Sequence, residues 1–145
     1  MKRRKGFTIV ELITVIVIIS ILATIAVVAS NYVQRQARDN ERKSDVLLLK
    51  NAIDKYHDNN GTYPLPASGC AVNNGCYVDL LIPILVPNYI SSIPSSPTGS
   101  NYAYVRGTDA EDSYGVYVPM EVAAVCKTGS KMNTVWWGSV PSCSF

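Results

Sequence analysis

The sequence of 145 residues has few of the residues on which catalysis and metal binding depend. It contains one histidine, His57, and four cysteines that form no CxxC pair. Zinc sites usually need such pairs or several histidines, so the sequence argues against zinc. It also has no nucleophile beside a base, no phosphate-binding loop and no pair of catalytic carboxylates. We therefore predict neither an enzyme nor a cofactor.

A concentrated basic face, which nucleic-acid binding requires, is missing as well. The chain has 13 Lys and Arg against 11 Asp and Glu, but four of the basic residues occupy positions 2–5. Residues 7–145 are left with a small acidic excess, so no nucleic-acid partner is indicated. Basic residues that precede an apolar segment are typical of the cytoplasmic side of a membrane.

Charge is absent from residues 12–29. As a helix, these roughly 18 residues would be about 27 Å long, close to the thickness of a bilayer's hydrocarbon core. A plain membrane anchor fits this stretch, and so does a secretory signal cleaved after Ala29, which would release a monomeric binding domain. Neither explains Glu11, because a carboxylate beside an apolar run is costly to insert into lipid.

The helical pattern continues beyond the apolar segment. Residues 32–59 contain no Pro or Gly. Four apolar side chains in this range recur at helical spacing, namely Val46, Leu49, Ile53 and Tyr56. Gly61 and Pro64 then end the helix. We expect one helix over about residues 7–59, with the second half packed on the rest of the chain.

Residues 5–12, Lys-Gly-Phe-Thr-Ile-Val-Glu-Leu, resemble the processing site of type IV prepilins and pseudopilins. In that family a short basic leader ends in Gly, Phe follows, and Glu is the fifth residue of the mature chain. The resemblance implies cleavage between Gly6 and Phe7 by a prepilin peptidase and methylation of the Phe7 amine. It also implies that this amine pairs with Glu11 of a neighbouring subunit. It is detailed over about the first 65 residues and holds in outline beyond them.

This resemblance implies a structural subunit of a type IV pilus or a pilus-like filament. The alternative is a pseudopilin of a type II secretion or DNA-uptake (competence) filament. The implied partners are further copies of the chain, the prepilin peptidase, membrane lipid before assembly, and an assembly platform with its ATPase. The precursor would lie in the inner (cytoplasmic) membrane and the filament at the cell surface.

Two residues depart from the family pattern. Ser20 stands where the family commonly has Gly, and Val28 where it commonly has Pro. Both replacements favour a helix, because Gly and Pro are the weakest helix formers. We expect a helix without interruption in the isolated subunit and less unwinding in the filament than in relatives that carry the Pro.

The C-terminal half predicts a small antiparallel sheet packed on the helix, an α+β fold. The expected divisions are a leader (1–6), a membrane and filament-core helix (7–33) and a globular domain (34–145). Within that domain we expect the helix to continue over 34–59, a loop region at 60–100 and the sheet at 101–145. Three β-prone runs are 102–106, 114–125 and 134–140, of which the first two would form a hairpin.

All four cysteines lie in this half, and an even number in an exported chain predicts two disulfides. Three pairings are possible, and proximity favours Cys70 with Cys76 and Cys126 with Cys143.

Three further features give only weak indications of function. Asp109 and Asp112 are weak calcium candidates, by resemblance to a loop of some pseudopilins, although an acidic loop is more often only solvated. One of Trp136 and Trp137 should be in the core, and the other is a candidate adhesive surface. His57 is expected to be a solvated helix residue.

Overall fold

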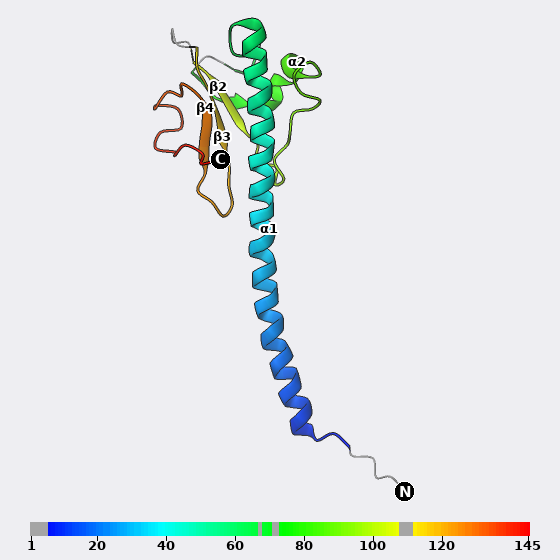
Figure 1. Cartoon of the computed structure of the whole chain (residues 1–145). Helices are drawn as coiled ribbons and strands as arrows, with labels where there is room; N and C mark the ends of the chain where they lie inside the picture. The colour runs from blue at the N-terminus through cyan, green and yellow to red at the C-terminus, as the bar shows by residue number, and fades with distance from the viewer. Residues whose placement is uncertain (1–5, 67, 71–72, 108–111) are drawn as a thin grey trace. The chain divides into compact units, whose positions relative to one another are not determined.

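The structure is a computed structural model and describes residues 6–66, 68–70, 73–107 and 112–145. The chain divides into two compact units, Met1–Arg35 and Gln36–Phe145, here called the N-terminal unit and the globular unit. One helix, α1 (Ile9–Asn60, 52 residues), contributes to both (Figure 1). The expected long helix is therefore confirmed, although it begins at Ile9 and not at Phe7.

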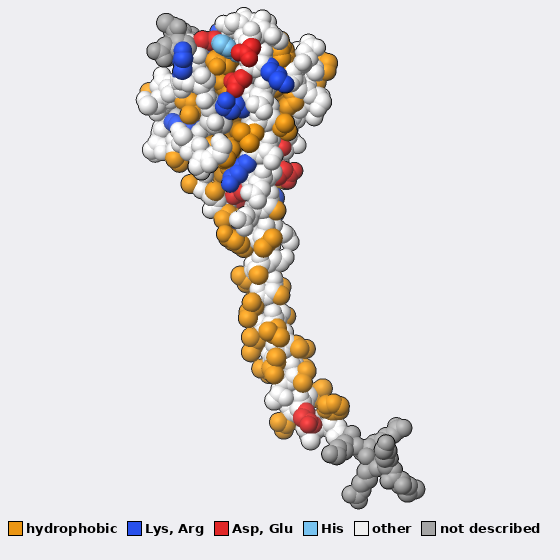
Figure 2. All heavy atoms as spheres, viewed as in Figure 1, with side chains coloured by type: hydrophobic (Ala, Val, Ile, Leu, Met, Phe, Trp, Pro, Cys, Tyr) orange, Lys and Arg blue, Asp and Glu red, His pale blue; other side chains and the backbone are white. Residues whose placement is uncertain are grey.

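In the N-terminal unit, α1 buries none of its side chains. Every residue from Gly6 to Ala37 is exposed, and hydrophobic side chains line this part of the helix (Figure 2). The hydroxyls of Thr14, Ser20 and Thr24 each donate to the backbone oxygen three residues earlier, at 2.7–3.0 Å. The polar groups of these side chains are thus satisfied inside the helix, as an apolar surrounding requires. The helix runs through Ser20 and Val28 without a break, as expected for the isolated subunit.

The globular unit contains a four-stranded antiparallel sheet in the order β1-β2-β3-β4. Its strands are β1 (Cys76–Tyr77), β2 (Ala103–Arg106), β3 (Tyr114–Val118) and β4 (Cys126–Ser130). A 3-10 helix, η1 (Val78–Leu81), and a single helical turn, α2 (Ile82–Leu85), connect β1 to β2. The α+β class and the β2–β3 hairpin are confirmed.

The strand boundaries differ from the expected ones in three places. The run 114–125 forms a strand only as far as Val118, because Pro119 has no amide hydrogen with which to continue the ladder. The run 134–140 is a series of turns and not a strand, and Trp137 and Gly138 both have a φ of 53°. The fourth strand is instead 126–130, and β1 lies inside the region expected to be loop.

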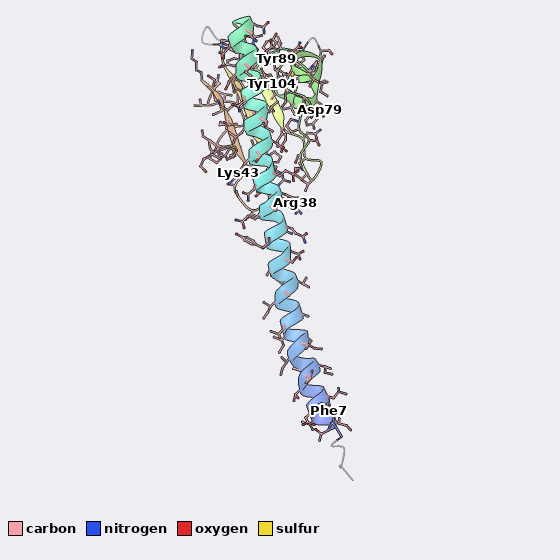
Figure 3. The ribbon with its side chains drawn as sticks, turned by 45° about the vertical axis from the view of Figure 1, so that its right-hand side comes forward. Phe7, Arg38, Lys43, Asp79, Tyr89 and Tyr104 are labelled. Carbon is pink, nitrogen blue, oxygen red and sulfur yellow. A yellow bond between two sulfur atoms is a disulfide. The ribbon has the colours of Figure 1, made fainter. Side chains whose placement is uncertain are left out.

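The core lies between α1 and one face of the sheet. The expected helix face is confirmed, since Val46, Leu49 and Ile53 are fully buried and Tyr56 packs at the edge of the cluster. β2, β3 and the residue just before β2 contribute a set of buried tyrosines and valines to this core: Tyr102, Tyr104, Tyr114, Val116 and Val118. Figure 3 labels Tyr104, whose hydroxyl donates to the backbone oxygen of Pro64 at 2.8 Å.

Both disulfides tie the ends of the sheet to neighbouring segments. Cys70 is bonded to Cys76 at the start of β1, and Cys126 at the start of β4 is bonded to Cys143. The amide of Cys143 also donates to the backbone oxygen of Lys127, at 2.9 Å. The C-terminal segment therefore lies along β4 and covers part of that edge of the sheet.

Candidate assembly site

The junction expected to be cleaved lies just before α1. Gly6 and Phe7 precede the helix, and the Phe7 side chain is 90% exposed (Figure 3). A Cβ atom added to Gly6 would meet no heavy atom within 4 Å. The fold therefore sets no steric requirement for glycine at this position.

Glu11 closes the first turn of α1 through a reciprocal contact with Thr8. The Thr8 amide and hydroxyl both donate to Glu11 Oε2 at 2.8 Å, and the Glu11 amide donates back to Thr8 Oγ1 at 3.2 Å. This is a capping box, in which two otherwise unpaired amides at a helix start find acceptors. The sequence analysis missed Thr8, although Thr-x-x-Glu ahead of an apolar run is the signature of this motif.

The carboxylate of Glu11 thus stands at the positive end of a long helix dipole, which favours a negative charge there. It is also the only acidic residue in the described part of the N-terminal unit. A cationic amine of another molecule could therefore pair with the Glu11 carboxylate, whose position is already fixed by its hydrogen bonds to Thr8.

By length and composition, α1 is suited to cross a membrane, and the apolar stretch that qualifies has none of its residues buried. Apolar side chains on all sides of a helix indicate surroundings of lipid or of equally apolar helices.

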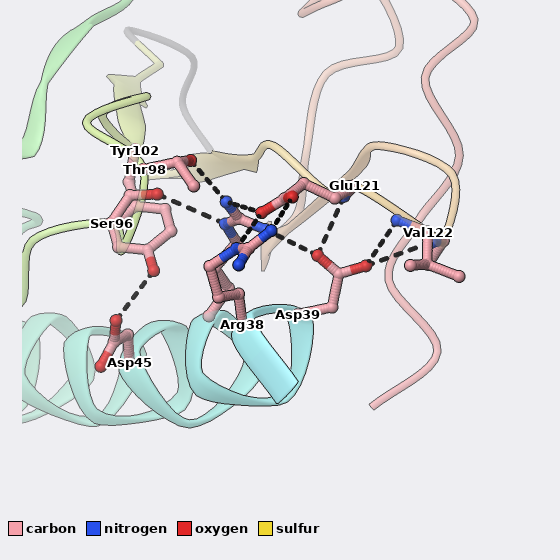
Figure 4. Close-up of polar contacts among 10 residues, drawn as sticks. Arg38, Asp39, Asp45, Ser96, Thr98, Tyr102, Glu121 and Val122 are labelled. Carbon is pink, nitrogen blue, oxygen red and sulfur yellow. Dashed lines mark hydrogen bonds and ion pairs between the residues drawn. The ribbon is translucent and has the colours of Figure 1, made fainter. Parts of the chain in front are cut away.

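In the globular unit, four charged residues connect α1 to the loop between β3 and β4. We call Arg38, Asp39, Arg42 and Glu121 the ionic cluster (Figure 4). Asp39 accepts hydrogen bonds from the backbone amides of Glu121, Val122 and Ala123 at 2.9, 2.9 and 3.2 Å. Three successive amides of one loop thus converge on a single carboxylate, which fixes the backbone of that loop on the helix.

Arg42 lies at the centre of the ionic cluster, and its side chain is 1% exposed. Its guanidinium donates to Asp39 at 2.7 Å and to Glu121 at 2.8 Å. Two hydroxyls from the segment before β2, Thr98 and Ser96, accept further bonds at 2.6 and 3.3 Å. A buried cation with this many partners is satisfied, and removing it would leave the carboxylates without their counter-charge.

The pKa values in the ionic cluster follow from these contacts. Burial raises the pKa of Asp39, but the three backbone amides and Arg42 lower it by more, so it falls below the usual value. Hydrogen bonds from Arg38 and Arg42 lower the pKa of Glu121 to about 2. Both carboxylates are therefore ionised at neutral pH.

The calcium candidates are only partly within the described residues. Asp109 lies outside them, so the calcium prediction stays a prediction. The carboxylate of Asp112 is 2.9 Å from Nε2 of His57 and 3.8 Å from the Arg106 guanidinium. The expectation of a solvated His57 was wrong, because its ring also stacks on Tyr63 at 4.3 Å. Within the described ranges, no three His, Cys, Asp or Glu side chains gather as metal ligands would.

The first 27 residues match the family described as the prokaryotic N-terminal methylation motif. The type II secretion system core protein G of Escherichia coli K12 is 28% identical over 94% of this chain and 92% of its own length. The proteins of the same name from Aeromonas hydrophila and Klebsiella pneumoniae are 32% and 30% identical. Each alignment covers 70% of this chain, and 72% and 74% of the respective relative. The chain belongs to the type II secretion system core protein G family.

Membership of the core protein G family confirms the resemblance to type IV pilin-like proteins, because this pseudopilin family is pilin-like. It also corrects the order of the two functional hypotheses. The relatives are named for a secretion system, so the pseudopilin alternative fits them better than a surface pilus. No solved structure gave a significant match.

Proposed function

We propose that this protein is a pseudopilin, a structural subunit of a type II secretion filament. It is inserted in the cytoplasmic membrane as a precursor and polymerises through residues 7–33. The observation that carries the proposal is the N-terminal unit itself, an exposed apolar helix with one carboxylate held at its start. The apolar side chains of this helix need apolar surroundings, which the rest of the chain does not supply. Membrane lipid or the same helix of other subunits would supply them.

Processing occurs between Gly6 and Phe7. Both residues are exposed and lie ahead of the helix, so a membrane peptidase reaches the bond without unfolding α1. Because the fold does not require glycine at position 6, a role in recognition by the prepilin peptidase explains that residue. The new Phe7 amine is then methylated. A cationic N-terminal amine has a reference pKa near 8, so it is largely charged at neutral pH.

Assembly pairs the Phe7 amine of one subunit with Glu11 of its neighbour. Each charge alone is costly in an apolar bundle, and the pair offsets part of that cost. The two groups lie four residues apart in the chain, at the start of α1, which begins at Ile9. The pair therefore fixes the axial offset between neighbouring helices, which is a role in register more than in stability.

The two parts of the chain then have different roles in the filament. Residues 7–33 form the membrane anchor and later the filament core, and residues 34–145 form the globular domain. The filament further requires the assembly platform and its ATPase, which act on the inserted precursor. Where the precursor lies in lipid, the hydroxyls of Thr14, Ser20 and Thr24 donate within the helix, so these three groups need no water.

The test is a deletion of this gene in its host, followed by complementation with the intact gene. We expect proteins that normally reach the medium to accumulate inside the cell envelope of the deletion strain, while long surface fibres are unchanged. Mass spectrometry of the mature protein should give an N-terminus at Phe7 that carries one methyl group.

Three outcomes would contradict the proposal. Loss of long fibres with normal secretion would assign the chain to a surface pilus, and loss of DNA uptake alone would assign it to a competence filament. A mature chain that begins at Ser30 would make it a secreted monomer.

A further inference from the structure

The sheet has a second face, which is turned away from α1 and its core. One row on this face crosses all four strands, since the register pairs Tyr77 with Ala103, Ala103 with Tyr117, and Tyr117 with Lys127. The neighbouring row contains Gly115. In the first row only Ala103 lies between Tyr77 and Tyr117, so Ala103 and Gly115 form a low floor beside the two tyrosine side chains.

The turns after β4 lay two indole rings over this floor. Trp136 is buried, and a Cβ atom at Gly115 would come within 3.2 Å of its ring and 3.0 Å of the Trp137 ring. The Trp137 ring lies between Gly115 and Gly75, where an added Cβ would be 3.8 Å away, and its centroid is 5.8 Å from that of Tyr117. Glycine at position 115 therefore allows both rings to lie on the sheet.

Hydrogen bonds to the residues before and after Trp137 fix its backbone. The buried Nζ of Lys127 donates to the backbone oxygens of Trp136 and Gly138, at 2.7 and 3.2 Å. Trp137 itself has a φ of 53°, a left-handed conformation that is rare for a bulky residue. Strain of this kind gathers at binding sites, where the surrounding structure enforces it. The structure thus holds the half-buried Trp137 in this left-handed conformation.

Two open cavities flank the Trp137 ring. The larger, about 520 Å³, is lined by Tyr77, Leu80, Ala103 and Trp137, among others. The smaller, about 270 Å³, is lined by Asn74, Val105, Val135 and the two tryptophans, among others. Gly75 and Trp137 line both cavities, which we together call the groove.

The lining decides what kind of ligand fits this groove. Among the described residues, none that lines either cavity is charged. A charged ligand would lose its hydration there without gaining a counter-charge, so the complementary ligand is neutral. A flat aromatic ring matches an apolar face of C–H groups, and the Tyr77 hydroxyl and the Asn74 amide can bond to hydroxyls at the edge of such a face. An apolar peptide would cover the ring but leave these polar groups unpaired.

We propose that this groove binds a neutral oligosaccharide, with one pyranose ring stacked on Trp137. Such a site is a function of the globular unit beyond filament assembly. It would bring a polysaccharide, or a protein that carries one, to the surface of the filament.

The test uses the full-length protein in phospholipid nanodiscs, because detergents with sugar head groups would themselves present the proposed ligand. The probes are three neutral hexasaccharides, namely cellohexaose, maltohexaose and the hexamer of N-acetylglucosamine. We expect at least one to shift the tryptophan fluorescence and to bind in calorimetry. Trp137→Leu, which keeps apolar bulk without a flat ring, should weaken binding by about tenfold or more, whereas Trp137→Phe should weaken it less.

Phe145→Leu is the matched control, since Phe145 is an exposed aromatic residue that lines neither cavity, and its affinity should be unchanged. If Trp137→Leu does not fold, Tyr77→Ala tests the same groove, because the Tyr77 side chain is 61% exposed and outside the core. Unchanged affinity in the variants, or no binding of any hexasaccharide at saturation, would overturn the proposal. Binding of a proline-rich peptide at Trp137 in place of the sugars would overturn it as well.

Discussion

The two halves of α1 belong to one helix but have opposite surroundings. From Gly6 to Ala37 no side chain is buried, and apolar residues occur on all sides. Between Asp39 and Ile53 the buried residues form one stripe, which packs on the rest of the globular unit. The first half satisfies its own hydrogen bonds but gains nothing from hydrophobic burial, whereas the second half is covered by its own chain. A substitution in the first half should therefore change assembly and leave folding intact, and one in the second half should do the reverse.

The largest expected effect is the loss of secretion on substitution of Glu11, in the first half of α1. Glu11→Gln keeps an acceptor for the capping contact with Thr8 but removes the charge, and it should abolish secretion. Thr8→Ala removes the cap but keeps the charge, and it should leave most secretion intact. Secretion into the medium is the measurement, with urea unfolding of the globular unit followed by the fluorescence of Trp136 and Trp137 as the second readout.

All variants at these two positions should unfold at the wild-type urea concentration, because neither residue belongs to the globular unit. If Glu11→Gln secretes normally and Thr8→Ala does not, Glu11 serves the helix start and not an ion pair between subunits. If either variant also unfolds earlier, the two halves are not independent and the comparison fails.

The second effect concerns Arg42 in the ionic cluster. Arg42→Met removes a buried cation and leaves Asp39 and Glu121 without it, which should lower the free energy of unfolding by about 3 kcal/mol. Urea unfolding of the full-length protein measures it. Arg38→Met is the matched control, because its ion pair with Glu121 is partly exposed and should contribute much less.

Processing at Gly6 and membrane insertion should be normal in both arginine variants. Equal stability of Arg42→Met and the wild type would mean that the loop after β3 is held by the backbone contacts of Asp39 alone. Failure of Arg42→Met to insert would tie the ionic cluster to the N-terminal unit.

The third effect concerns the two disulfides. Cys126 and Cys143 are 17 residues apart, whereas Cys70 and Cys76 are six apart. In the chain-entropy model a closed loop of this longer size contributes about 3 kcal/mol, and a shorter loop contributes less. Cys143→Ser should therefore increase proteolysis of the globular unit more than Cys70→Ser does, measured as the half-life in a limiting amount of protease. The reverse order would show that the position of the bridge matters more than the length of its loop.

What the sequence predicted well depends on local patterns that leave few alternatives. The helix followed from the spacing of Val46, Leu49 and Ile53 and from the stop at Gly61, where φ is 72°. The β2–β3 hairpin followed from two β-prone runs with a polar connection. The capping contact of Thr8 could also have been predicted, because Thr-x-x-Glu is the local signature of a capping box.

What the sequence did not predict depends on contacts between distant segments. β4 reads Cys-Lys-Thr-Gly-Ser, which has little strand propensity, and its pairing with β3 forms it. The ionic cluster joins residues about 80 positions apart, and a surface helix with alternating charges gives no sign of which arginine will be buried. His57 was misjudged for the same reason, because Asp112 comes from another part of the chain.

The smallest expected effect is the dependence of stability on pH, and it should come from the globular unit alone. The folded pKa of Glu121, about 2, is below the value near 4.3 of an unfolded glutamate, so its contribution is present above about pH 4.3 and is lost as the pH falls toward 2. Burial raises the pKa of Tyr102 and Tyr114, so their contribution is present below about pH 10 and is lost as the pH rises further. Glu121→Gln should therefore flatten the acid side of a stability–pH curve, measured by urea unfolding, and leave the alkaline side unchanged. An acid side as steep as that of the wild type would assign the acid sensitivity to Asp39, whose pKa is lowered by backbone amides that this substitution does not remove.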